Sequence, residues 1–131
     1  MSRYVRVAVA ARHASDVVQA LAAIDLEPQV GRPEQLLMLE GSLECAGEPV
    51  ELRFDAGVCN TVEDFGFVCD AQGRYQLVCG EFDRALLEKV LLVPLRRQLA
   101  LLGTLDAAHQ LGLAAEVTET EGVARIVLRE A

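Results

Sequence analysis

The alternation of apolar and polar positions predicts that the chain begins with a strand followed by a helix. Val5, Val7 and Val9 fall on one face of the segment 4–9, which is rich in β-branched residues. Ser15 and Asp16 are suitable N-cap residues for a helix over residues 14–25. One apolar stripe at helical spacing supports that helix: Val17, Ala20, Leu21 and Ile24.

The next part of the chain is expected to form a loop and then two strands. Residues 26–34 contain two prolines and a glycine, which indicate a loop. The apolar run 35–40 is compatible with a strand or a helical turn, and we favour a strand. Residues 50–54 alternate between apolar and charged side chains, which predicts a strand with one face in water, paired with the 35–40 segment.

A β-hairpin over residues 65–79 is the clearest local signal. If residues 71–73 form a three-residue loop with Gly73 in the left-handed conformation, Cys69 lies opposite Tyr75. That register places one apolar face toward the core: Phe65, Phe67, Cys69, Tyr75, Leu77 and Cys79. A two-residue loop would pair Cys69 with Gln76 and mix polar and apolar side chains on both faces, so we reject it.

The pattern becomes helical from residue 82 to residue 111. Pro94 is tolerated only in the first turn of a helix, which predicts a short helix over 82–92 and a main helix that restarts at Pro94. Gly112 is expected to cap the main helix. Two antiparallel strands, 113–117 and 123–128, should then close the fold around Glu121-Gly122.

Together these elements predict a single α+β domain over residues 1–131. We expect a two-layer sandwich with a mostly antiparallel sheet, one short N-terminal helix and one long C-terminal helix. The expected order is β-α-β-β-β-β-α-β-β.

Composition agrees with a globular protein that has no membrane span. Of the 131 residues, 52% are hydrophobic and 24% are charged. The longest apolar run, 90–95, contains a proline and precedes two arginines, so it is too short to cross a bilayer. Arg6 interrupts the N-terminal apolar segment where a signal peptide needs an unbroken stretch, so we expect a cytoplasmic protein.

The net charge of −8 disfavours nucleic acid as a partner, because an acidic surface repels the phosphate backbone. Three arginines, Arg84, Arg96 and Arg97, form the one local exception. We interpret them as ordinary helix-surface charges rather than an anion site.

The four cysteines, at positions 45, 59, 69 and 79, show none of the spacings of a zinc site. We interpret them as reduced thiols that pack as small apolar residues, with no metal and no cofactor. The alternative is a small-molecule, metal or redox site built from Cys59, Cys69, Cys79 and nearby carboxylates.

No motif indicates catalysis, and we predict no catalytic residue. The chain has two histidines and lacks a Gly-x-Ser-x-Gly segment, a Walker loop and a Gly-x-Gly-x-x-Gly segment. His109 is expected to interact with the C-terminal end of its helix. The candidate interaction residues are four carboxylates that bracket the 65–79 hairpin as a solvated acidic patch, together with one loop histidine: Glu63, Asp64, Glu81, Asp83 and His13.

Several short segments resemble a known family. They are Asp25-Leu26-Glu27, Asp64-Phe65-Gly66-Phe67, the segment 73–78, Arg97-Gln98-Leu99-Ala100 and the closing strands to Arg129. In this order they resemble the family called domain of unknown function 1257, which includes the hypothetical chloroplast reading frame 35. The resemblance spans nearly the whole chain. It implies bacterial or plastid relatives, no established activity, and genes near ATPases of the AAA class, and so an accessory or adaptor role.

The sequence therefore favours a non-catalytic interaction module that binds a protein partner or a second copy of itself through an acidic surface or a sheet edge.

Overall fold

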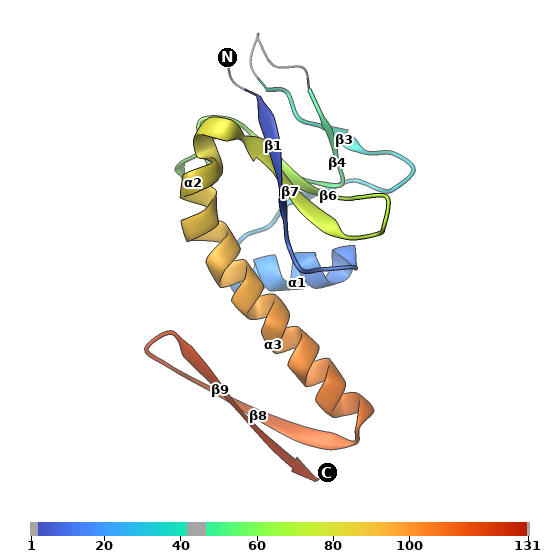
Figure 1. Cartoon of the computed structure of the whole chain (residues 1–131), viewed down its shortest axis with the longest axis vertical. Coiled ribbons are helices and arrows are strands. Elements are labelled where there is room, and N and C mark those ends of the chain that lie inside the picture. Colours follow the sequence, from blue (N-terminus) through green and yellow to red (C-terminus); the bar gives the residue numbers. More distant parts are fainter. Residues whose placement is uncertain (1–2, 42–46, 131) are drawn as a thin grey trace.

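The computed structural model describes residues 3–41 and 47–130, and it shows an α+β fold with antiparallel sheets (Figure 1). The main sheet has five strands in the order β1-β7-β6-β5-β2, and all neighbouring strands are antiparallel. Its strands are β1 (Tyr4–Ala8), β2 (Gln29–Val30), β5 (Leu52–Phe54), β6 (Phe65–Cys69) and β7 (Tyr75–Gly80).

Helices cover one face of this sheet. They are α1 (Ala14–Ala23), the single turns η1 (Val58–Asn60) and η2 (Glu81–Asp83), and a long helical segment formed by α2 (Arg84–Leu87), η3 (Glu88–Leu92) and α3 (Val93–Gln110). Helices α1 and α3 contact each other. Phe65, Phe67 and Leu77 from the sheet and Leu21 and Leu95 from the helices are fully buried in the resulting core.

A small hairpin covers the opposite face of the sheet. Strand β3 (Leu37–Met38) pairs with β4 (Pro49–Val50), as predicted for the segments 35–40 and 50–54. A second apolar cluster forms beneath it from Leu39, Val50, Val68 and Val78. The pair β6–β7 is therefore buried on both faces.

The predicted register of the β6–β7 hairpin is confirmed, with Cys69 opposite Tyr75. Gly73 has a φ of +76°, and the Asp70 carboxylate accepts hydrogen bonds from the amides of Gln72 and Arg74. The core face holds as predicted except at Cys69, which lies at the open end of the strand and is exposed.

The region before β6 differs from expectation in three ways. Strand β2 lies within the predicted loop 26–34. The predicted strand 50–54 is divided at Glu51 into β4 and β5, which belong to different sheets. Glu51 does not face water: its side chain is buried and accepts a hydrogen bond of 2.8 Å from the Tyr75 hydroxyl.

Helix α1 begins at Ala14 as predicted, but neither expected cap is used. His13 occupies the N-cap position, and no side chain caps the first turn. Ser15 and Asp16 are both helical.

Pro94 lies in the first turn of α3, as predicted, but the helical path continues through it. The π-helical turn η3 directly before Pro94 changes the backbone hydrogen-bonding pattern. The proline, which has no N–H to donate, is thereby accommodated without a break between α2 and α3.

The C-terminal part forms the predicted antiparallel pair. Gly112 ends the helical segment with a φ of +71°. Strands β8 (Leu113–Thr120) and β9 (Val123–Glu130) then form a two-stranded sheet of their own, away from the five-stranded sheet (Figure 1). None of the helices in the described ranges is long and apolar enough to cross a membrane.

We predict that Gly73→Val lowers the free energy of unfolding by about 1–2 kcal/mol, because a β-branched residue is strained at positive φ. A Cβ at Gly73 would meet no atom within 4 Å, so the cost is conformational only. Gly103→Ala is the matched control: it also has open space but lies in α3, where alanine should stabilise the helix by about 0.5–1 kcal/mol. Urea unfolding measures the free energy of unfolding of both variants. An equal change in the two variants would contradict the left-handed turn at Gly73 and the β6–β7 register that depends on it.

Candidate functional site

The β8–β9 hairpin is the candidate interface. Its principal contacts with the rest of the protein are those of β8 with α3. At the tip, the Arg97 guanidinium lies 3.6 Å from the position that a Cβ on Gly122 would occupy. The hairpin thus lies beside α3, at the opposite end of the molecule from β3–β4 (Figure 1).

One face of the hairpin is mostly apolar. It is formed by the cross-strand pairs Leu113–Glu130, Ala115–Leu128, Val117–Ile126 and Glu119–Ala124. The side chains of Leu113, Ala124 and Ile126 are partly covered. Leu128, however, is 47% exposed and Val117 is 36% exposed. The structure therefore covers only part of this face.

The other face is mixed. Glu116 forms an ion pair with Arg129 across the strands, at 2.5 Å. Val123 and Val127 are exposed beside them, Val123 by 67%. Exposed β-branched side chains on a two-stranded ribbon are a feature of surfaces that pair with another chain.

Neither edge of the hairpin pairs with another strand in the described part of the chain. The two-residue turn has positive φ at Glu121 (+52°) and Gly122 (+76°), as in a type I′ turn. In such a hairpin the pair flanking the turn, Thr120–Val123, is hydrogen-bonded, and hydrogen-bonded and non-hydrogen-bonded pairs then alternate.

The alternation determines which backbone groups point outward from β9. They are the N–H and C=O groups of Ala124, Ile126 and Leu128. Because no strand in the described ranges pairs with this edge, these free groups form an open template for a further strand. A two-stranded hairpin on its own is only marginally stable in water, so a further strand would also stabilise it.

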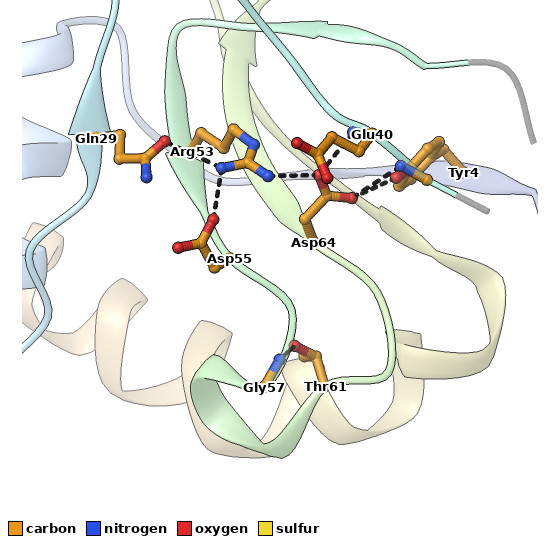
Figure 2. A network of polar contacts seen from close by, with 9 residues as sticks. Tyr4, Gln29, Glu40, Arg53, Asp55, Gly57, Thr61 and Asp64 are labelled. Carbon is orange, nitrogen blue, oxygen red and sulfur yellow. Dashed lines mark hydrogen bonds and ion pairs between the residues drawn. The ribbon is translucent and has the colours of Figure 1, made fainter.

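The predicted acidic patch is not a solvated surface, because Asp64 is buried. Its carboxylate accepts hydrogen bonds from the Tyr4 hydroxyl at 2.6 Å and from the amides of Glu40 and Gly41 at 2.7 and 3.2 Å (Figure 2). It also forms an ion pair of 3.0 Å with Arg53. Burial alone would raise the pKa of Asp64, but these donors together lower the pKa below its ordinary value.

Arg53 connects this network to the neighbouring segments. Its guanidinium donates to the Gln29 side-chain oxygen at 3.0 Å and to Asp55 at 2.6 Å (Figure 2). Asp64 and Arg53 thus tie β5, the start of β6, β1 and the segment after β3 together. The network joins these segments through buried groups, although the Arg53 Nε atom has no hydrogen-bond partner among the described residues.

The other predicted carboxylates are divided between the interior and the surface. Asp83 is buried and accepts hydrogen bonds of 2.9 Å from the amides of Val62 and Glu63. Glu63 is partly buried, and its Oε2 atom has no hydrogen-bond partner among the described residues. Glu81 is exposed and forms an ion pair with Arg3. Asp64 and Asp83 are therefore not available as a charged docking surface.

Cys69 and Cys79, two of the cysteines considered for a shared site, do not lie side by side. Cys69 is exposed and Cys79 is buried, and they lie four strand positions apart, or about 13 Å along the sheet. Burial, followed by the nearby charge of Asp83, raises the pKa of Cys79 to about 11, and burial also raises the pKa of Cys59. Among the described residues no group of three or more His, Cys, Asp or Glu side chains is placed to hold a metal ion. Cys45 lies outside the described residues.

The predicted arginine cluster is dispersed. Arg84 pairs with Glu88 on the long helical segment, Arg96 donates to the Ala8 carbonyl, and Arg97 lies beside the hairpin tip. His109 is exposed in the last turn of α3, where the helix-end interaction was expected. His13, the fifth candidate, lines a cavity between the β1–α1 loop and α3.

The interface residues that sequence reasoning missed lie on strands it did predict. The closing strands were expected to end at Val117 and Leu128, whereas they extend to Thr120 and Glu130. The β-branched residues Thr118 and Thr120 favour a strand and could have shown this extension. Nothing in a single strand's pattern shows that the pair stands apart from the main sheet.

The structure defines an α+β fold with an open C-terminal β-hairpin. No family model, no curated protein and no solved structure matches the chain. The resemblance to domain of unknown function 1257 accordingly remains an expectation from the sequence.

We predict that Asp64→Asn lowers the free energy of unfolding by about 2–4 kcal/mol, because it leaves the mostly buried Arg53 without its buried counterion. Asp55→Asn is the matched control, since it removes the exposed partner of the same guanidinium and should cost under about 1 kcal/mol.

The pH dependence of stability provides a second test of the Asp64→Asn variant. The folded pKa of Asp64 is lowered from 3.8, so its stabilisation is complete above that value and is lost as the pH falls through the folded pKa. Thermal unfolding followed from neutral to strongly acidic pH should therefore show a shallower acid loss in Asp64→Asn than in wild type. An equal loss of stability with falling pH in wild type and in Asp64→Asn would contradict the assignment of this stabilisation to the Asp64 carboxylate.

Proposed function

We propose that this protein is a non-catalytic interaction module that binds another protein chain through the β8–β9 hairpin. The observation that carries the proposal is a two-stranded ribbon with unpaired edges in the described part of the chain and exposed apolar side chains on both faces. Adding a strand to such an edge supplies main-chain hydrogen bonds for affinity, and the alternating side chains supply specificity. The resemblance to a family with genes near AAA-class ATPases supports an adaptor role.

The occupant that β9 itself favours is a second copy of β9, related by a two-fold axis perpendicular to the ribbon. In such an antiparallel pair, residues facing each other must lie on the same face of the ribbon. When the axis passes through Ile126, Ile126 meets its own copy and Ala124 meets Leu128. All three present their free backbone groups to the partner strand.

Neighbouring registers are less favourable for electrostatic reasons. An axis through Val127 would place Arg125 opposite Arg129, and an axis through Arg125 would place two Arg125 side chains opposite each other. In the Ile126 register, Arg125 lies opposite Val127 and Arg129 lies opposite Val123, so no like charges are directly opposed.

Charge also sets the conditions for this pairing. The chain carries a net charge of −8, so two copies repel each other at long range, but β9 itself contains Arg125 and Arg129 against one carboxylate, Glu130. Salt screens the long-range repulsion and leaves the apolar and backbone contacts in place. Dimerisation should therefore strengthen as the salt concentration rises.

Cross-linking through single introduced thiols tests both the dimer and its register. In the proposed pair the two Cα atoms of residue 126 lie about 5.5 Å apart, within disulfide range, so Ile126→Cys should form a disulfide between the two copies of position 126 under mild oxidation. Val127→Cys is the matched control, because the two copies of residue 127 would be more than about 7 Å apart and would not cross-link.

Mass spectrometry of the linked peptides separates this disulfide from any formed by Cys69, which is exposed. Light scattering of the unmodified protein should give twice the monomer mass of 14.2 kDa at high micromolar concentration. A monomer under these conditions, or preferential linking through position 127, would overturn the proposed pairing.

A further inference from the structure

The β1–α1 loop and α3 border an open cavity of about 1160 Å³ that is separate from the hairpin edge. Its lining combines two kinds of side chain. Val9 and Leu99 are buried at its wall, and Leu102 and Leu105 are partly buried. Basic groups from three separate segments line the same cavity: Arg12 and His13 before α1, Arg74 before β7, and Arg96 on α3.

The arginines at this cavity form no ion pair among the described residues, in a protein with an excess of acid. The chain has 20 aspartate and glutamate residues against 12 lysine and arginine residues. Across the described ranges, carboxylates pair with several arginines elsewhere: Arg3, Arg6, Arg53, Arg84 and Arg129. Arg12, Arg74 and Arg96 form no ion pair within those ranges, although Asp16 and Asp106 also line the cavity.

Arg96 is fixed in position without losing its capacity to bind. One terminal nitrogen donates to the Ala8 carbonyl at 2.7 Å. A guanidinium has five N–H donors, so the remaining donors are available to a carboxylate or phosphate. Arg12 and Arg74 are exposed beside it and form no side-chain hydrogen bond among the described residues.

The backbone of the β1–α1 loop is held in a strained form at the same place. Ala10 has a φ of +21°, which a residue with a Cβ rarely adopts. The loop is clamped to β7 on both sides of Ala10, because Val9 N–H donates to the Tyr75 carbonyl and Tyr75 N–H donates to the Ala11 carbonyl. The chain therefore bulges at Ala10, in the cavity wall, next to Arg12 and His13.

The first turn of α1 brings its N-terminal N–H groups to the cavity, together with the carboxylate of Asp16. No side chain caps it, and its N-terminus lies at His13 on the cavity lining. Helix N-termini carry a partial positive charge and free N–H groups that favour an anion. This contribution is additional to the three arginines and does not define the site alone.

We infer that this cavity binds a small organic anion, with a carboxylate or phosphate group held by Arg12, Arg74 and Arg96 and an apolar body placed against Leu99 and Leu102. The arginines of the lining match the anionic group of the ligand, and the leucines match its apolar body. An inorganic anion would leave the apolar wall in water, and a neutral apolar molecule would leave the arginines without a counterion.

Titration of the ¹⁵N-labelled protein with phenyl phosphate, followed by amide NMR shifts, tests the inference. Saturable shifts are expected in residues 8–16, at Tyr75 and in residues 96–106, while the hairpin amides stay unchanged. Inorganic phosphate should bind at least about tenfold more weakly, since it lacks the apolar contact. Sodium benzoate in parallel compares a carboxylate with a phosphate head group.

Arginine variants assign the shifts to the cavity. Arg12→Ala and Arg74→Ala should each weaken phenyl phosphate binding about tenfold, because each removes a charge-assisted contact from an exposed side chain. Arg32→Ala is the matched control: Arg32 is an exposed arginine outside the cavity, without an ion pair within the described ranges, and its loss should leave the affinity unchanged.

Three results would overturn the inference: no saturable shift with phenyl phosphate or benzoate, equal affinity for inorganic phosphate, or equal loss of affinity in Arg32→Ala. The inference stands apart from the hairpin proposal, because a monomeric protein can bind the anion and a dimer can form without it.

Discussion

Burial of the β6–β7 pair on both faces is the constraint on which the rest of the structure depends. Phe65, Phe67 and Leu77 face the helices, while Val68 and Val78 face β3–β4. Gly66 between them permits the close approach of the neighbouring strand, since a Cβ there would overlap the Leu52 carbonyl oxygen. With no face of this pair in water, α1 and the start of the long helix must cover one side and the small hairpin must cover the other.

This arrangement completes the core before the chain ends. The buried positions of the long helix are concentrated at its start, at Leu87, Leu91, Leu92 and Leu95. Toward its C-terminal end the long helix leaves the main sheet, and α3 contacts strand β8 of the C-terminal hairpin (Figure 1). The hairpin is thus positioned by the fold but not buried by it, which makes it the part of the described chain best suited to meet another protein.

Sequence patterns were most informative where a local rule determines the geometry. Gly73 and the alternation around it were sufficient for the register of β6–β7. Pro94 was sufficient to place the first turn of α3, but not to show that the helical path continues through it. Alternation failed at Glu51 and Arg53, because it reports which residues share a face but not what covers that face. Asp64 was misassigned for the same reason: its partners Tyr4 and Glu40 are far from it in sequence.

Two features were beyond reach of sequence patterns for a different reason. The isolation of β8–β9 depends on which strands pair in space, and strand composition does not encode that choice. The basic cavity combines Arg12, Arg74 and Arg96 from three distant segments, and only the folded chain brings them together. Both features depend on long-range contacts, which leave no periodic signal in the sequence.

Amide hydrogen exchange on β9, measured at low and high protein concentration, tests most directly whether a second copy completes the hairpin. The account predicts that the outward-facing amides of Ala124, Ile126 and Leu128 exchange quickly in dilute protein and become protected at high concentration. The amides of Arg125 and Val127, which face β8, should change much less. Equal exchange of the three outward-facing amides at both concentrations would contradict the account.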